Sequence, residues 1–95
     1  MAMSVLAIQT PGEALRLLTR KAGMTQAEVA RRSGISRQTI SAYYSDAHRM
    51  DARTWAILVD VLARANGVDP TELRTELDAI LLAQKMYSDD MVPVA

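Results

Sequence analysis

The side chains best able to do acid–base or metal chemistry are few and scattered in this sequence. His48 is the single histidine, and there is no cysteine to pair with it. A disulfide framework, a thiolate zinc site and a cysteine nucleophile are therefore excluded. Isolated acids and one histidine also make neither a general acid–base pair nor a nucleophile triad. We expect a protein that binds rather than an enzyme, with no catalytic residue, metal site or cofactor.

The basic side chains are the remaining candidates for chemistry, and they are unevenly distributed. The formal net charge is zero, yet residues 1–53 hold eight Lys or Arg and four acids, whereas residues 54–95 hold three bases and seven acids. A first half with a charge of +4 favours a polyanionic partner for that half. The alternative is a mixed, solvated surface, and charge alone does not decide between the two.

Length and composition favour one small helical domain to position these groups. A chain of 95 residues is long enough for one domain, and 49% hydrophobic residues can build its core. Only 4% of residues are aromatic, so aliphatic side chains must fill that core, which suits helices better than strands. No apolar run approaches the roughly 18 residues that span a membrane, and residues 1–9 lack the basic start of a secretory signal. We expect an all-α, cytoplasmic protein without membrane association.

Capping residues mark the ends of five expected helices. Thr10 and Glu13 have the spacing of a capping box, and Pro11 suits the first helical position. Thr25 and Glu28 repeat the capping-box spacing. Ser36, Asp51 and Asp69 are the other expected caps, and the five helices are expected from Pro11 to near Gly23, Gln26 to Ser33, Arg37 to about Tyr44, about Ala52 to Asn66, and Pro70 to near Tyr87.

These elements divide the chain into four parts. The parts are an apolar segment at 1–9, a helical domain at 10–75, an extension of the fifth helix at 76–87 and a flexible tail at 88–95. The first segment is undecided between arm, strand and helix. Apolar residues in the first and third parts either complete the core of one chain or contact a second copy. We favour a homodimer through Leu77, Ile80 and Leu81.

Two short helices with a glycine in the link between them form the most specific pattern in the sequence. A link of three or four residues that contains glycine is what a helix-turn-helix requires. Ala30 is small enough for a close crossing, and Gly34 can leave the first helix in the left-handed conformation. The residues expected to form the core of this motif are Ala30, Gly34, Ile35, Ile40 and Tyr43.

The motif resembles a known family. Residues 25–44 read T-Q-A-E-V-A-R-R-S-G-I-S-R-Q-T-I-S-A-Y-Y, which is similar to the helix-turn-helix of phage repressors, Cro and the xenobiotic-response-element (XRE) type of regulator. The resemblance extends over residues 15–73 and implies a compact five-helix, lambda-repressor-like domain. Asp46 stands where this family commonly has glycine, and Met50 where it has proline. Because Asp tolerates the left-handed region, we expect the turn at Asp46 to survive.

The resemblance also implies how DNA is contacted. The second helix of such a motif enters the major groove, where an Arg side chain suits guanine and a Gln side chain suits adenine. The expected base contacts are Arg37, Gln38, Ser41 and Ala42, and the expected phosphate contacts are Gln26, Ser36, Thr39, Tyr44, His48 and Arg49. For Tyr44 the alternatives are packing, contact with phosphate through its hydroxyl, or both. Solvated helix faces explain Arg16, Arg20, Lys21, Arg31 and Arg32 as well as DNA contact does.

We therefore expect a sequence-specific regulator of transcription that binds double-stranded DNA. One domain presents few contacts, so a homodimer on a palindromic operator, acting as a repressor, is the simplest form. The alternative is a protein-interaction subunit, such as an antitoxin or a phage adaptor, built on the same scaffold.

Overall fold

A computed structural model describes the backbone of residues 8–91 and the side chains of residues 8–82. Within this range the chain forms five helices and no strand, so the all-α prediction is confirmed. The helices are α2 (Pro11–Lys21), α3 (Gln26–Ser33), α4 (Arg37–Tyr44), α5 (Ala52–Asn66) and α6 (Pro70–Met91).

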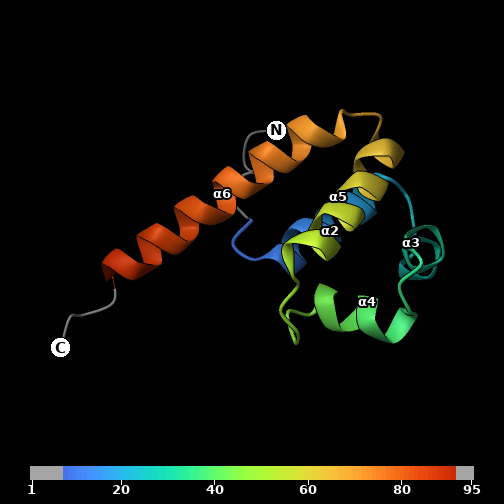
Figure 1. The fold of residues 1–95 in the computed structure, drawn as a ribbon, viewed down its shortest axis with the longest axis horizontal. Coiled ribbons are helices and arrows are strands. Elements are labelled where there is room, and N and C mark those ends of the chain that lie inside the picture. Colours follow the sequence, from blue (N-terminus) through green and yellow to red (C-terminus); the bar gives the residue numbers. More distant parts are fainter. Residues whose placement is uncertain (1–7, 92–95) are drawn as a thin grey trace.

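α2 and α5 lie near the middle of the molecule, and each of the other helices packs against at least one of them. α2 packs against α4 and α5, α3 packs against α4 and α5, and α6 packs against α5. As a result α4 and α6 lie on opposite sides of the α2–α5 pair (Figure 1). The short helix α4 is therefore the outermost element on its side of the domain.

The predicted N-caps explain why the helices begin where they do. The side-chain oxygens of Thr10, Thr25, Ser36 and Asp51 each accept a hydrogen bond from the backbone N–H three residues further on. Each bond satisfies one of the N–H groups that a helix start leaves free. The hydrogen bond from the Thr54 N–H holds the pKa of Asp51 below its ordinary value. The capping residues thus define helix starts that hydrophobic spacing alone leaves uncertain.

Aliphatic side chains fill the core, as the composition predicts. The largest fully buried side chains are Leu15, Val29, Ile40, Leu58, Val59 and Leu62. Ile8 is also buried, at 5% exposed, so this residue of the N-terminal segment completes the core of its own chain. Met3, Val5 and Leu6, which the same prediction covered, lie outside the described residues.

The last helix is longer than predicted. The expected end near Tyr87, with a tail from Ser88, is wrong, because α6 continues to Met91. No glycine or proline interrupts the sequence between Pro70 and Pro93, so nothing in it stops the helix earlier. The second half of α6 extends beyond the other helices (Figure 1).

Candidate nucleic-acid interface

The turn between α3 and α4 has the geometry that the sequence predicts. Gly34 ends α3 in the left-handed conformation, with φ 77°, and its N–H donates to the Ala30 carbonyl at 2.9 Å. Ala30 is 7% exposed and Ile40 is fully buried, while Ile35 is half-buried at the corner. Val29, which the sequence analysis left out, is also fully buried. The turn and these buried side chains fix the orientation of α4 relative to α3.

One side of α4 stays exposed because the other is packed into the core. Arg37, Gln38 and Ser41 are exposed, and Ala42 is half-buried. The structure therefore brings the four predicted base-contact residues together at the surface of one short helix. An Arg fork and a Gln amide are able to form paired hydrogen bonds with base edges in a major groove.

The polar residues at the start of α4 also bond to one another. The Ser36 hydroxyl accepts from the Thr39 N–H at 3.2 Å and donates to the Thr39 hydroxyl oxygen at 2.8 Å. Ser36 is exposed and Thr39 is half-buried. Helix capping is therefore the role that the structure gives Ser36, and the Thr39 hydroxyl keeps its own proton available for another acceptor.

The start of α3 presents a second polar site. Gln26 is exposed at the first position of the helix, next to the capping box of Thr25 and Glu28. Helix N-termini attract anions, because their free N–H groups can donate hydrogen bonds and the helix dipole places a partial positive charge there. Glu28 also lies 3.8 Å from the Arg31 guanidinium and 4.0 Å from that of Arg32. Exposed pairs of this kind contribute little energy, so both arginines remain available to a polyanion.

The two tyrosines at the end of α4 differ in burial from what the sequence predicts. Tyr44, an expected phosphate contact, is 2% exposed, and its hydroxyl lies 2.5 Å from the Thr19 hydroxyl in the core. A phosphate cannot reach it there, so that prediction is corrected: Tyr44 packs. Tyr43, expected in the motif core, is only half-buried against it. Burial raises the pKa of the Tyr44 phenol, against the opposing effect of its hydrogen bond with Thr19.

The loop after α4 confirms the prediction made for Asp46. Its φ is 60°, so an aspartate occupies the left-handed position that glycine commonly fills in the resembled family. Its carboxylate accepts hydrogen bonds from the Gly12 N–H and the Thr10 hydroxyl. His48 and Arg49 are exposed in the same loop, beside the end of α4. The spacing of residues around Gly12 does not predict its part in this contact, which depends on a loop more than thirty residues later.

A comparison with protein families matches residues 12–77 to a helix-turn-helix domain. The match covers more than half of the chain and includes the whole of α3, the turn and α4. The chain belongs to the helix-turn-helix domain family. Membership in this family indicates a DNA-binding regulator. No curated protein and no solved structure matches the chain.

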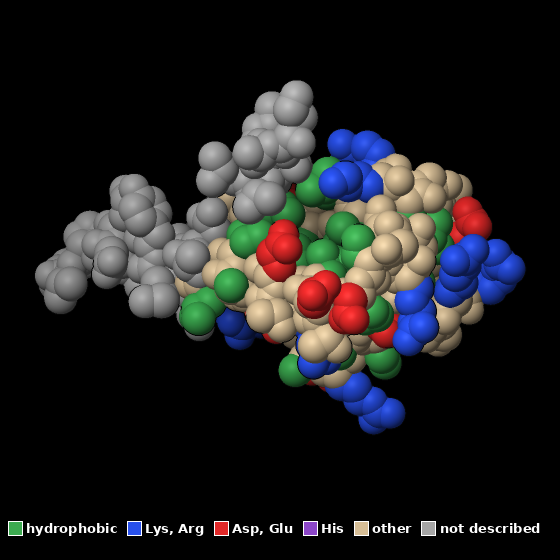
Figure 2. Space-filling model, turned by 90° about the horizontal axis from the view of Figure 1, so that it is seen from above, with side chains coloured by type: hydrophobic (Ala, Val, Ile, Leu, Met, Phe, Trp, Pro, Cys, Tyr) green, Lys and Arg blue, Asp and Glu red, His purple; other side chains and the backbone are tan. Residues whose placement is uncertain are grey.

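The side of the helix-turn-helix domain away from α4 has a different character. Figure 2 shows this face, with Asp and Glu side chains near its middle and most Lys and Arg side chains toward its edges. In the described part of α6, Glu72, Glu76 and Asp78 are all exposed, against one base, Arg74. This face therefore disfavours a polyanion. The basic side chains of α3, α4 and the following loop form a better binding surface for one.

The residues predicted to contact a second copy lie differently from expectation. Leu77 is only 3% exposed and belongs to the core of its own chain, so its predicted role in a dimer interface is wrong. Ile80 and Leu81 are half-buried and pack against the same core. Leu82, in contrast, is 58% exposed. The helical spacing predicted which side of α6 is apolar, but not that α5 already covers most of it.

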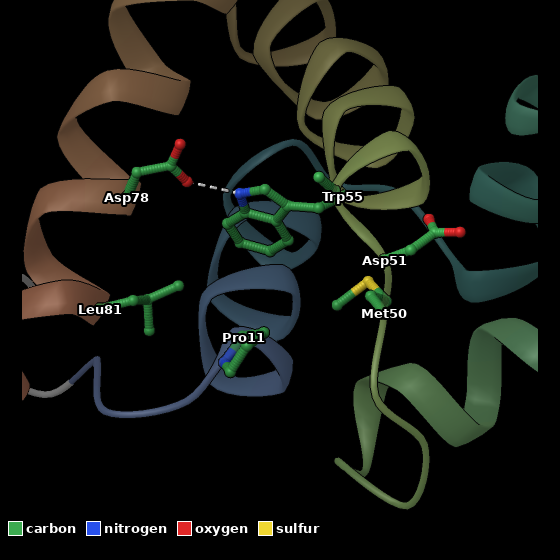
Figure 3. Close-up of a pocket in the computed structure, with 7 residues that line it drawn as sticks. Pro11, Met50, Asp51, Trp55, Asp78 and Leu81 are labelled. Atoms are coloured by element: carbon green, nitrogen blue, oxygen red, sulfur yellow. Dashed lines mark hydrogen bonds between the residues drawn. The ribbon is translucent and has the colours of Figure 1, made fainter. Parts of the chain in front are cut away.

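An open pocket lies where α2, α5 and α6 approach one another. Its volume is about 240 Å³, below the usual range of small-molecule sites. Figure 3 shows Trp55 of α5 reaching toward α6, where its indole N–H donates to Asp78 at 2.7 Å. The Trp55 ring packs against the core but is only half-buried. In the helix-turn-helix domain this pocket lies at the junction of α6 with α5.

No helix in the described part of this helix-turn-helix protein is long and apolar enough to cross a bilayer.

Proposed function

We propose that this protein is a sequence-specific regulator of transcription that reads double-stranded DNA with α4. The observation that carries the proposal is the arrangement of this helix. Ile40 and Tyr44 anchor it in the core, which leaves Arg37 and Gln38 exposed at its N-terminal end. In helix-turn-helix proteins the N-terminal residues of the second helix contact base edges. The proposed activity is binding, with no catalytic step.

The phosphate backbone supplies the other contacts in this proposal. Gln26 is exposed at the start of α3, while His48 and Arg49 are exposed in the loop that follows α4. Hydrogen bonds to phosphates position a protein on the duplex, whereas contacts with base edges provide specificity. We assign Arg37, Gln38, Ser41 and Ala42 to the bases, and Gln26, Thr39, His48 and Arg49 to the backbone, while Ser36 caps α4 and orients Thr39.

We further propose that the protein binds a palindromic operator as a homodimer in the cytoplasm and represses transcription by occupying a promoter. This is the mode of action of the phage repressor, Cro and XRE type of domain that the sequence resembles. A single domain of this size offers less surface than specific DNA binders usually bury, about 1,000–2,500 Å². The exposed Leu82 on α6, on the side of the domain away from α4, makes that helix the candidate dimer contact.

Selection of bound sequences from a random pool of duplex DNA tests this function. We expect a site with two-fold symmetry whose half-sites lie about 34 Å apart. A dimer that makes about eight to ten phosphate contacts should lose affinity with a log–log salt slope of about −7 to −9. Failure to enrich any sequence, together with a flat salt response, would refute the proposal.

Two variants and one control separate DNA reading from protein interaction. Arg37→Ala should abolish operator binding while the chain stays folded, since the side chain is exposed. Leu82→Glu should shift sedimentation from dimer to monomer, and Ile57→Glu, at another exposed apolar side chain, should not. If Arg37→Ala leaves the biological activity intact while Leu82→Glu destroys it, the alternative of an antitoxin or phage adaptor replaces the proposed function.

A further inference from the structure

Asp46 adopts a backbone conformation that costs free energy for an aspartate and not for a glycine. The contacts of its side chain explain why an aspartate occupies this position. Among the described residues it is the one non-glycine with a positive φ, at 60°. Aspartate tolerates this region better than most residues, but glycine enters it at no steric cost. A residue held in such a conformation by its surroundings points to a role for its side chain.

The carboxylate of Asp46 occupies the start of α2. One oxygen accepts from the Gly12 N–H at 2.9 Å, and the other accepts from the Thr10 hydroxyl at 2.7 Å. The first N–H groups of a helix have no partner within the helix, and the dipole favours a negative charge there. The loop that follows α4 is thereby attached to a helix more than thirty residues earlier in the sequence.

Gly12 makes this contact sterically possible. A Cβ at this position would lie 2.5 Å from a carboxylate oxygen of Asp46 and 2.6 Å from the Tyr44 carbonyl oxygen. The second of these atoms is backbone and cannot turn away. The absence of a side chain at Gly12 is therefore required by the end of α4 and the loop, and not by the conformation of α2 itself.

Two further contacts attach the last residue of α4 to α2. The Arg16 guanidinium donates a hydrogen bond to the Tyr44 carbonyl, one of the carbonyls that a helix end leaves free. The Tyr44 hydroxyl bonds to Thr19 one turn further along α2. With Asp46, these contacts hold both the end of the proposed recognition helix and the start of the loop that carries His48 and Arg49.

We propose that Asp46 is a positioning residue for DNA binding: its carboxylate, seated on Gly12 and Thr10, fixes α4 and the following loop for contact with the duplex. This inference rests on the proposed function. It predicts a change in DNA affinity of opposite sign to the change that the charge of Asp46 alone would cause. Removal of a negative charge near DNA should strengthen binding, because it removes a Coulomb repulsion between Asp46 and the phosphates. Detachment of the loop from α2 should instead weaken binding.

The test compares three variants on the selected operator and on random duplex DNA. Asp46→Gly keeps the left-handed turn but removes both hydrogen bonds, and we expect operator affinity to fall about tenfold, in line with the removal of two bonds. Affinity for random DNA should fall less than affinity for the operator, because detachment of the loop loosens only the phosphate contacts of His48 and Arg49, and the loss of a negative charge offsets part of that effect. Asp46→Asn removes the same charge, but its amide oxygen can still accept from the Gly12 N–H and its NH2 group can donate to the Thr10 hydroxyl oxygen, so operator affinity should stay within about threefold of the wild type.

Gly12→Ala approaches the same contact from the other side without a change of charge. It should weaken operator binding as Asp46→Gly does, and it keeps the test available if one variant folds poorly. Asp69→Asn, which removes a charge from the cap of α6, is the matched control and should change neither affinity.

Operator binding by Asp46→Gly that equals or exceeds that of the wild type, with an unchanged helical circular dichroism spectrum, would overturn the positioning role alone. Equal losses of affinity for Asp46→Gly and Asp46→Asn would also overturn it, because the hydrogen bonds that Asn retains to α2 would then make no difference. If the wild-type chain selects no DNA, the proposed function fails first, and the positioning role fails with it.

Discussion

Replacement of Tyr44 by phenylalanine isolates one buried hydrogen bond between α4 and α2. The Thr19 hydroxyl donates its single proton to the Leu15 carbonyl at 2.6 Å, so the Tyr44 hydroxyl must be the donor in the 2.5 Å contact with Thr19. Tyr44→Phe removes this donor and leaves the ring in place. The Thr19 oxygen then has one partner fewer in a site that water does not readily enter.

The expected loss of stability is modest but measurable. A net hydrogen bond contributes about 0.5–1.5 kcal/mol, and the buried oxygen left behind favours the upper part of this range. For a domain of this size, 1 kcal/mol lowers Tm by about 4–8 °C. Urea denaturation followed by circular dichroism should show a midpoint lower by about 0.5–1 M at an unchanged slope.

Tyr43→Phe is the matched control, because the neighbouring ring is half-buried and its hydroxyl makes no hydrogen bond among the described residues. The pH dependence adds a second readout. Burial raises the pKa of Tyr44, so its stabilising effect is complete below about pH 10 and is lost as the pH rises toward the folded-state pKa. Tyr44→Phe should remove this alkaline loss. Equal midpoints for the two variants, or an unchanged alkaline profile, would refute the reasoning.

Three other predictions concern packing, a helix cap and base reading. Ile40→Ala should lower the free energy of unfolding by about 2–5 kcal/mol in the same denaturation assay, since the side chain is fully buried; a decrease below about 1 kcal/mol would contradict this packing. Because the Thr54 N–H lowers the pKa of Asp51, its stabilising effect is present above about pH 4 and is lost as the pH falls through the folded-state pKa. Asp51→Asn keeps a capping oxygen and should flatten this acid limb, and an identical acid limb would exclude the cap as its source. In binding titrations, Gln38→Ala should relax base preference at one position of each half-site, whereas Arg49→Ala should weaken binding to all sequences alike; equal weakening on operator and random DNA for both would remove Gln38 from the readout.

The helices could be predicted from the sequence because their ends are marked chemically. Thr10, Thr25, Ser36 and Asp51 each hold the backbone N–H that the capping rule assigns to them. Gly34 adopts the left-handed conformation that the turn requires. Such local rules act within a few residues and need no knowledge of what packs nearby, so they specified α3, α4 and the turn between them.

The side chains that depend on distant partners could not be predicted in the same way. Residues three and four positions after Ile40 both lie near its face of α4, so helical spacing does not choose between Tyr43 and Tyr44. Thr19 makes that choice by offering a buried partner to the phenol of Tyr44. The burial of Leu77 was missed for a similar reason, because spacing on α6 does not reveal which apolar residues α5 covers.

The hydrogen bond from Trp55 to Asp78 gives this protein a built-in optical probe. Trp55 is the only tryptophan of the chain, and its indole stands at the junction of α5 and α6. Its emission will therefore respond when α6 separates from α5, even while α3 and α4 remain folded. Any event that moves the last helix away from α5 therefore becomes visible in solution without a chemical label.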